Sequence, residues 1–182
     1  EKPIIYHERE GEETLDSFQD GWRHVRFMLV NAPGYLFSGP GIAMGVVGLV
    51  VMALAFSGVS VGPLSLWLHS MVAGSLLVLV GSQVFSMGVF STVAGDPIQK
   101  PADPLTERLT KEIRLEQGVT VGLAVFGGGA IYAVYIVTGW ASSGFTALPL
   151  LVADIAAFTA ILLGLQLIFS AFLLSVLAER SN

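Results

Sequence analysis

The sequence predicts an all-α membrane protein with four transmembrane helices, which form two tandem hairpins, each preceded by an amphipathic interfacial helix. Of the 182 residues, 53% are hydrophobic and 13% are charged, and the mean hydropathy is +0.73, far more apolar than a soluble domain. A hydrocarbon core about 30 Å thick needs roughly 20 apolar residues for each helical crossing. The runs long enough to cross are residues 35–59, 66–93, 119–140 and 148–177.

The positions of the cations predict how these helices are oriented in the membrane. All nine Lys and Arg lie before residue 27, between residues 100 and 114, or at Arg180. The other two connections, residues 57–65 and 140–149, carry no charge. Because cytoplasmic loops of membrane proteins are enriched in Lys and Arg, we expect both termini and the middle loop on the cytoplasmic side.

Residues 16–95 are expected to form the first unit, an interfacial helix followed by a hairpin. Phe18, Trp22, Val25 and Leu29 recur at spacings of four, three and four, which places them on one helical face with polar residues on the other. Such a helix lies in the plane of the membrane interface, and the plainer interpretation is a cytoplasmic lead-in. The run NAPG that follows is expected to break the helix before the first crossing.

Residues 96–182 repeat this plan, and residues 1–15 before the first unit are expected to be a cytoplasmic tail. Asp103 and Pro104 are a typical helix cap and first-turn pair. An apolar stripe at helical spacing follows and consists of Leu105, Leu109 and Ile113. Because both units start in the cytoplasm, they form a parallel repeat and not the inverted repeat of many transporters.

Two glutamines occupy matching positions in the second and fourth crossings. Residues 81–91 resemble residues 164–175, since each segment has Gly-x-Gln followed by Phe-Ser. An unpaired amide is costly in lipid, so Gln83 and Gln166 are expected to form an interhelical hydrogen bond. A role along a substrate path is the alternative.

Asp154 is the only carboxylate within a crossing, and an acid in a membrane segment is a functional candidate. It lies near the outer end of its run, as does His69, and no acid or histidine at greater depth would complete a proton relay. The three glycines at residues 127–129 are expected to allow close helix packing rather than to bind phosphate, because they lie inside a membrane run.

The sequence contains no complete enzymatic site. It has no cysteine, no nucleophile beside a base and no cluster with metal-ligand spacing. We therefore expect the chain alone to be non-catalytic and to bind no metal or cofactor. Nucleic acid is excluded as a partner, because the 9 cations adjoin membrane segments and are outnumbered by 14 carboxylates.

Residues 3–37 resemble the junction between the catalytic domain and the membrane region in family 2 glycosyltransferases of the polyprenyl-phosphate type, relatives of dolichyl-phosphate mannose synthase. The resemblance rests on DGWRHVRF at residues 20–27, with Arg9, Gly11 and Leu15 upstream. The segment GLQLIFSAFLLSVLAE near the carboxyl end also resembles the last helix of bacterial members with four crossings. The resemblance therefore covers essentially the whole chain.

This resemblance implies transfer of a sugar from a nucleotide donor to a polyprenyl phosphate at the cytoplasmic face of a prokaryotic membrane. The nucleotide-binding domain would precede residue 1, and a divalent metal would belong to that domain. The chain departs from the family at Glu13 and Thr14, where members have Ser-Lys, and the carboxylates nearby would repel a phosphate. The departure keeps open a second class, a non-catalytic structural subunit of a larger membrane complex. A transporter or flippase is a third, weakened by the scarcity of buried charge.

Four cations are candidates for holding a lipid phosphate, namely Arg9, Arg23, His24 and Arg26. Arginine suits phosphate because its planar guanidinium donates two hydrogen bonds at once. Each cation at headgroup height contributes about 1 kcal/mol toward holding an anionic lipid. The expected partners are membrane lipid and, more specifically, polyprenyl phosphate. Ordinary anchoring to anionic lipid is the alternative, and a homo-oligomer or a larger membrane complex is left open.

Overall fold

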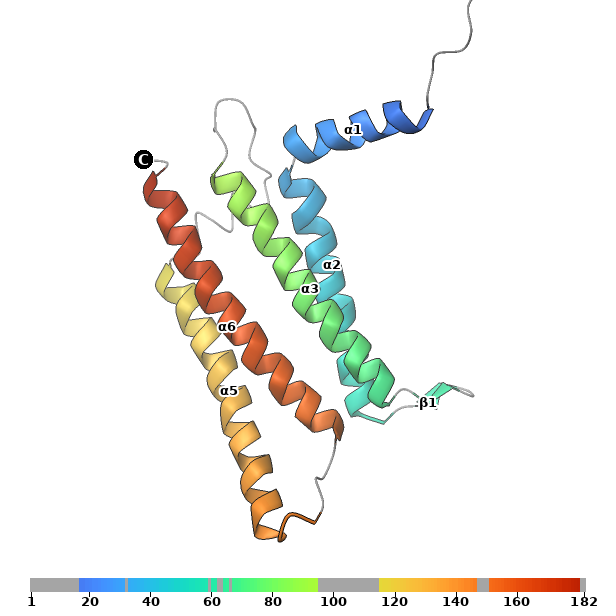
Figure 1. Cartoon of the computed structure of the whole chain (residues 1–182), viewed down its shortest axis with the longest axis vertical. Helices are drawn as coiled ribbons and strands as arrows, with labels where there is room; N and C mark the ends of the chain where they lie inside the picture. The colour runs from blue at the N-terminus through green and yellow to red at the C-terminus, as the bar shows by residue number, and fades with distance from the viewer. Residues whose placement is uncertain are drawn as a thin grey trace, which may run out of the picture.

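The computed structural model consists of two helical hairpins with a shorter helix across one end (Figure 1). It describes residues 17–31, 33–58, 60–61, 64–65, 67–94, 115–146 and 151–180. The helices are α1 (Ser17–Asn31), α2 (Pro33–Phe56), α3 (Leu68–Val93), α5 (Leu115–Ser142) and α6 (Leu151–Arg180). Between α2 and α3, the two-residue strands β1 (Ser60–Val61) and β2 (Leu64–Ser65) pair antiparallel.

Four of these helices are long and apolar enough to cross a membrane. Their candidate spans are Leu36–Phe56, Leu68–Val93, Glu116–Ser142 and Leu151–Glu179. The all-α architecture with four crossings is therefore confirmed, and the chain is an integral membrane protein. Helices suit this environment because each satisfies its own backbone hydrogen bonds where lipid offers no partner. The second interfacial helix, expected near residues 103–114, lies outside the described residues, as does the tail at residues 1–15.

Helix α1 has the features of an interfacial helix. It ends at Asn31, and α2 begins at Pro33, because proline suits the first turn of a helix and not its interior. The apolar face predicted from the spacing is largely uncovered, with Phe18 82% exposed and Trp22 59% exposed. Among the described helices α1 contacts only α2, across whose end it lies (Figure 1). An apolar face without a protein partner at the edge of a membrane bundle is typical of a helix lying on the bilayer.

Within each hairpin, glycines spaced seven residues apart bring the two backbones together. The glycines whose added Cβ would lie less than 3 Å from the partner helix are Gly41 and Gly48 in α2, Gly74, Gly81 and Gly88 in α3, Gly122 and Gly129 in α5, and Gly164 in α6. A Cβ on Gly48 would lie 2.7 Å from the carbonyl oxygen of Gly74, and one on Gly129 would lie 2.9 Å from that of Ala157. Small residues at helix contacts permit this approach in membranes. Of the three consecutive glycines predicted to aid packing, only Gly129 does so, because Gly127 and Gly128 face open space.

The two hairpins meet mainly along α3 and α6, a contact that we call the inter-hairpin seam (Figure 1). We call the end of the bundle that carries α1 the α1 end, and the opposite end, where the hairpins turn, the loop end. At the loop end Ala55, Met71 and Val152 form a buried apolar cluster, which we call the loop-end cluster. It joins α2, α3 and α6, and Met71 is only 1% exposed. The seam is thus tightly packed at one end.

Candidate functional site

The middle of the inter-hairpin seam is polar. The Nε2 of Gln166 donates a hydrogen bond to Oε1 of Gln83, at 2.8 Å. The Oγ of Ser82 lies 2.9 Å from Oε1 of Gln166, to which it donates. Both glutamines lie in the middle third of their helices, where a bonded partner is worth about 0.6 to 2 kcal/mol. The two amides that the sequence set at matching positions are therefore bonded directly to each other.

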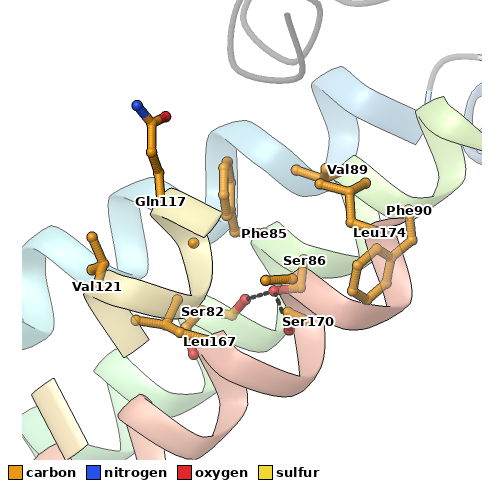
Figure 2. A pocket seen from close by; sticks show the side chains of 12 residues that line it. Ser82, Phe85, Ser86, Val89, Phe90, Gln117, Val121, Leu167, Ser170 and Leu174 are labelled. Atoms are coloured by element: carbon orange, nitrogen blue, oxygen red, sulfur yellow. Dashed lines mark hydrogen bonds between the residues drawn. The ribbon is translucent and has the colours of Figure 1, made fainter. Parts of the chain in front are cut away.

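Two further serines, Ser86 and Ser170, extend this polar region toward the α1 end. Ser170 donates to Ser86 with an Oγ–Oγ distance of 3.4 Å, which is long for a hydroxyl pair. Ser86 Oγ also donates to the backbone carbonyl of Ser82 at 2.9 Å. Figure 2 shows Ser86 bonded to both Ser82 and Ser170, with apolar side chains around them. We call the set Ser82, Gln83, Ser86, Gln166 and Ser170 the polar clasp.

A groove with a volume of about 420 Å³ lies beside the polar clasp, between α3, α5 and α6. Its lining is mostly apolar and aromatic. The lining residues are Ser82, Phe85, Ser86, Val89 and Phe90 of α3, Gln117, Gly118 and Val121 of α5, and Leu167, Ser170, Ala171 and Leu174 of α6 (Figure 2). All lie in the half of the bundle nearer the α1 end. The groove was not predicted from the sequence, where its only trace is the pair of Phe-Ser motifs.

The candidate phosphate-binding cations that the structure describes all lie on α1. Arg23, His24 and Arg26 are exposed, and Arg23 and Arg26, three residues apart, share a face of the helix. Arg23 pairs with Asp20 at 3.7 Å, with the two side chains 78% and 40% exposed. Such an exposed pair is weak and leaves the guanidinium able to exchange partners. Arg9 lies outside the described residues.

The structure does not bring these cations to the groove. Helix α1 contacts α2, whereas the groove is formed by α3, α5 and α6. A binding site that used both would therefore have to extend along the surface of the bundle. This separation could not be read from the sequence, because it depends on which hairpin helix faces the other hairpin.

Asp154 lies in the first turn of α6, at the loop end. Its Oδ1 is buried and has no hydrogen-bond partner. His69, in the first turn of α3, is exposed. The described part of the chain contains no group of three or more His, Asp and Glu residues that could hold a metal ion. Asp154 is therefore separated along the helix from both the polar clasp and the groove.

Comparison with known proteins supplies the wider context. Residues 89–178 match the family model described as the glycosyltransferase family 2 C-terminal transmembrane region. This chain is a glycosyltransferase-associated membrane region. It is also 51% identical, over 179 residues, to the low-salt glycan biosynthesis hexosyltransferase Agl6 of Haloferax volcanii. That similarity covers 98% of this chain but 43% of the relative, so the chain spans less than half of the length of that hexosyltransferase. No solved structure matches the chain.

The matched family region begins at Val89 in α3 and ends in the last turns of α6. It therefore includes all of α5 and all but the last two residues of α6, together with Val89 and Phe90 of the α3 residues that line the groove. The family resemblance predicted from the sequence is confirmed by this match. The polar clasp straddles the start of the matched region, with Gln83 before it and Gln166 within it.

Proposed function

We propose that this chain anchors a glycosyltransferase to the membrane and positions the phosphate of its lipid acceptor. The transferred sugar would come from a nucleotide donor, and the acceptor would be a polyprenyl phosphate at the cytoplasmic face of a prokaryotic membrane. The observation that carries this proposal is the similarity of 98% of the chain to part of a hexosyltransferase. The distribution of cations supports placing both termini, and hence α1, on the cytoplasmic side.

The acceptor's phosphate would be held on α1. Arg23 and Arg26 lie three residues apart on α1, which on this proposal would lie at headgroup height. His24 on the same helix, and Arg9 earlier in the sequence, would add further basic side chains. Two guanidinium groups one turn apart converge on one phosphate, with charge-assisted hydrogen bonds from each. Exchange of Asp20 for the phosphate on Arg23 costs little, because the existing pair is exposed.

The acceptor's hydrocarbon tail would lie along the bundle and enter the groove. The groove has a lining dominated by Phe, Leu and Val side chains and opens in the half nearer α1. A polyprenyl chain is long and flexible, so its phosphate can sit on α1 while a more distant part of its tail reaches α3 and α6. Neither site contains a group that activates a sugar donor. That chemistry, with its divalent metal, would belong to a nucleotide-binding domain of the glycosyltransferase.

A binding experiment in lipid nanodiscs tests the phosphate site. The full chain is titrated with polyprenyl phosphate and, separately, with a bulk anionic phospholipid. We expect tighter binding of the polyprenyl phosphate and a clear loss of that preference in Arg23→Gln/Arg26→Gln. The corresponding Lys pair should retain part of it, because the charge survives and the planar fork does not. Added salt should weaken binding, since exposed charges are screened over about 8 Å at physiological ionic strength.

The control variant is Arg108→Gln/Lys111→Gln, which removes the same charge from the middle loop. It should bind polyprenyl phosphate as the unsubstituted chain does. Equal affinity for both lipids would show that α1 only anchors the chain in anionic lipid and does not recognise polyprenyl phosphate. Turnover of a nucleotide sugar by this chain alone would contradict the proposal that a separate nucleotide-binding domain supplies the catalytic chemistry.

A non-catalytic subunit of a larger membrane complex is the second candidate. It is favoured by Glu13 and Thr14, which replace the Ser-Lys pair of the family and lie outside the described residues. The two candidates differ in what precedes Glu1 in the gene. An in-frame nucleotide-sugar-binding domain with an acidic metal motif supports the glycosyltransferase, whereas a start codon directly upstream supports the subunit.

A further inference from the structure

The inter-hairpin seam changes character along its length. At the loop end it is closed by the apolar loop-end cluster, in which Met71 is 1% exposed. In the middle it is held by side-chain hydrogen bonds between Gln83 and Gln166 and between Ser82 and Gln166. Toward the α1 end it gives way to the groove. The contact between the hairpins therefore becomes weaker in one direction, toward the side from which a lipid would enter.

Each hairpin, in contrast, is expected to move as a unit. Its helices touch backbone to backbone through glycines, and a Cβ on Gly81 would lie 2.6 Å from the amide nitrogen of Gly45. Such a contact has no long side chain that could adopt another rotamer. Relative motion is therefore concentrated at the inter-hairpin seam, where the contacts in the middle are made by side chains.

Two of the three serines in the polar clasp keep an acceptor when it opens. The Ser82 hydroxyl is 2.9 Å from the carbonyl of Leu79 as well as from Gln166, so it keeps an acceptor within its own helix. Ser86 likewise donates to the Ser82 carbonyl at 2.9 Å. Opening therefore breaks the Gln83–Gln166 bond and the Ser170–Ser86 contact. The Ser170–Ser86 contact, at 3.4 Å, is already long, so the glutamine bond is the stronger of the two.

We propose that the two hairpins open as rigid bodies about the loop-end cluster, with the Gln83–Gln166 bond as the latch, and that this opening admits a lipid chain to the groove. The identity of the lipid as a polyprenyl phosphate rests on the proposed function. The latch itself does not, because it follows from the packing of α3 against α6. Gln83 is exposed at the edge of the seam, so opening does not leave its amide in a closed apolar core.

Disulfide cross-linking tests the latch, and the absence of native cysteine makes the chain suitable for it. In Ser86→Cys/Ser170→Cys, two side chains whose oxygens are 3.4 Å apart are within reach of a bond. Oxidation should hold the α1 end of the seam closed and slow polyprenyl-phosphate binding about tenfold or more, since the open state is then depopulated. Reduction should restore the rate. The matched control, Met71→Cys/Val152→Cys, joins the helices at the loop-end cluster, and oxidation there should leave the binding rate unchanged.

A second measurement needs no lipid acceptor. Spin labels at Ala94→Cys and Glu179→Cys report the separation of α3 and α6 near the α1 end, where both positions are exposed. Gln83→Leu/Gln166→Leu should shift the distances between the labels to larger values, and labels across the loop-end cluster should report no shift.

The two measurements distinguish a failure of the latch from a failure of the proposed function. If the label distances shift but polyprenyl phosphate does not bind, the latch stands and the proposed function fails. An unchanged distance distribution in the Gln→Leu pair overturns the latch. So does failure of Ser86→Cys/Ser170→Cys to cross-link, or an oxidised protein that binds lipid as fast as the reduced one.

Discussion

The helices within each hairpin contact each other through their backbones, whereas the two hairpins contact each other through side chains. Inside the hairpins, glycines such as Gly48 and Gly129 remove the side chain and let backbone meet backbone. Between the hairpins, amide and hydroxyl groups of α3 and α6 meet instead. Lipid offers no hydrophobic drive for helices to associate, so both contacts depend on close packing or hydrogen bonds. The backbone contacts within a hairpin allow only one packing arrangement. The side-chain hydrogen bonds between the hairpins can break and form with other partners.

The seam also joins equivalent positions of the two units. Gln83 bonds to Gln166, which occupies the matching place in the related segment. Ser86 contacts Ser170, and each of these serines ends the Phe-Ser motif of its segment, three and four residues after the glutamine. When equivalent residues meet each other, the two units are related by an approximate two-fold axis through the contact, as in the symmetric interface of a dimer. A parallel repeat with this axis along the membrane normal is what the cation distribution predicts.

The largest effect expected is an all-or-none pattern of chemical labelling. If the hairpins are parallel units, both hairpin turns face outward, and Ser60→Cys and Ser143→Cys should react with an impermeant thiol reagent in intact cells. Thr106→Cys, in the middle loop, should be spared until the cells are lysed. Strong external labelling at residue 106 would show that the units are not parallel.

Loss of a glycine contact should cost more stability than loss of any hydrogen bond in the polar clasp. We expect Gly81→Ala to lower the free energy of unfolding by about 1–3 kcal/mol, because its Cβ meets the backbone of α2 and the core must shift. Gly128→Ala is the control, since nothing lies within 4 Å of its Cβ. Denaturant titration in mixed micelles measures both. Equal losses would mean that the glycines do not set the hairpin contact.

The glutamines of the latch should have smaller and unequal effects. Gln166→Leu removes two hydrogen bonds and Gln83→Leu removes one, so both should lower the free energy of unfolding by less than about 2 kcal/mol, with Gln166→Leu the larger. The same titration ranks them, and the double variant reveals their coupling. A larger loss in Gln83→Leu than in Gln166→Leu would contradict the bonding described here.

The smallest effect is expected at Ser170. Its contact with Ser86 is 3.4 Å long, so Ser170→Ala should change the free energy of unfolding by less than about 0.6 kcal/mol. Ser57→Ala, which loses only a bond from the turn after α2 to the Leu54 carbonyl three residues before it, is the control. If Ser170→Ala costs as much as Gln166→Leu, the Ser170–Ser86 contact is stronger than its length of 3.4 Å indicates.

Local rules predicted much of this fold from the sequence. The four spans follow from the length of the apolar runs, and the break between α1 and α2 follows from the proline at residue 33. The amide pair of Gln83 and Gln166 was identifiable because polar residues are rare in lipid and these two recur in a repeat. Each of these predictions needs only the chain's own periodicity and composition.

Some features depend on how the helices face one another, and these could not be predicted from the sequence in the same way. The groove needs Phe90, Val121 and Leu174 from three helices to converge, and no single helix reveals their convergence. The separation of Arg23 and Arg26 from the groove depends on α1 lying against α2. The three glycines at residues 127–129 could not be told apart from the sequence either. Only Gly129 contacts α6, because the orientation of α5 about its own axis turns the other two away.

The hairpins also differ in length, and this difference links the protein to the bilayer around it. Helices α2 and α3 contain 24 and 26 residues, and α5 and α6 contain 28 and 30. At 1.5 Å per residue, α6 is about 9 Å longer than α2. A helix longer than the local hydrocarbon thickness is accommodated by tilting or by deforming the lipid beside it. We therefore expect the second hairpin to respond more than the first to a change in bilayer thickness, and to transmit that change to the seam that borders the groove.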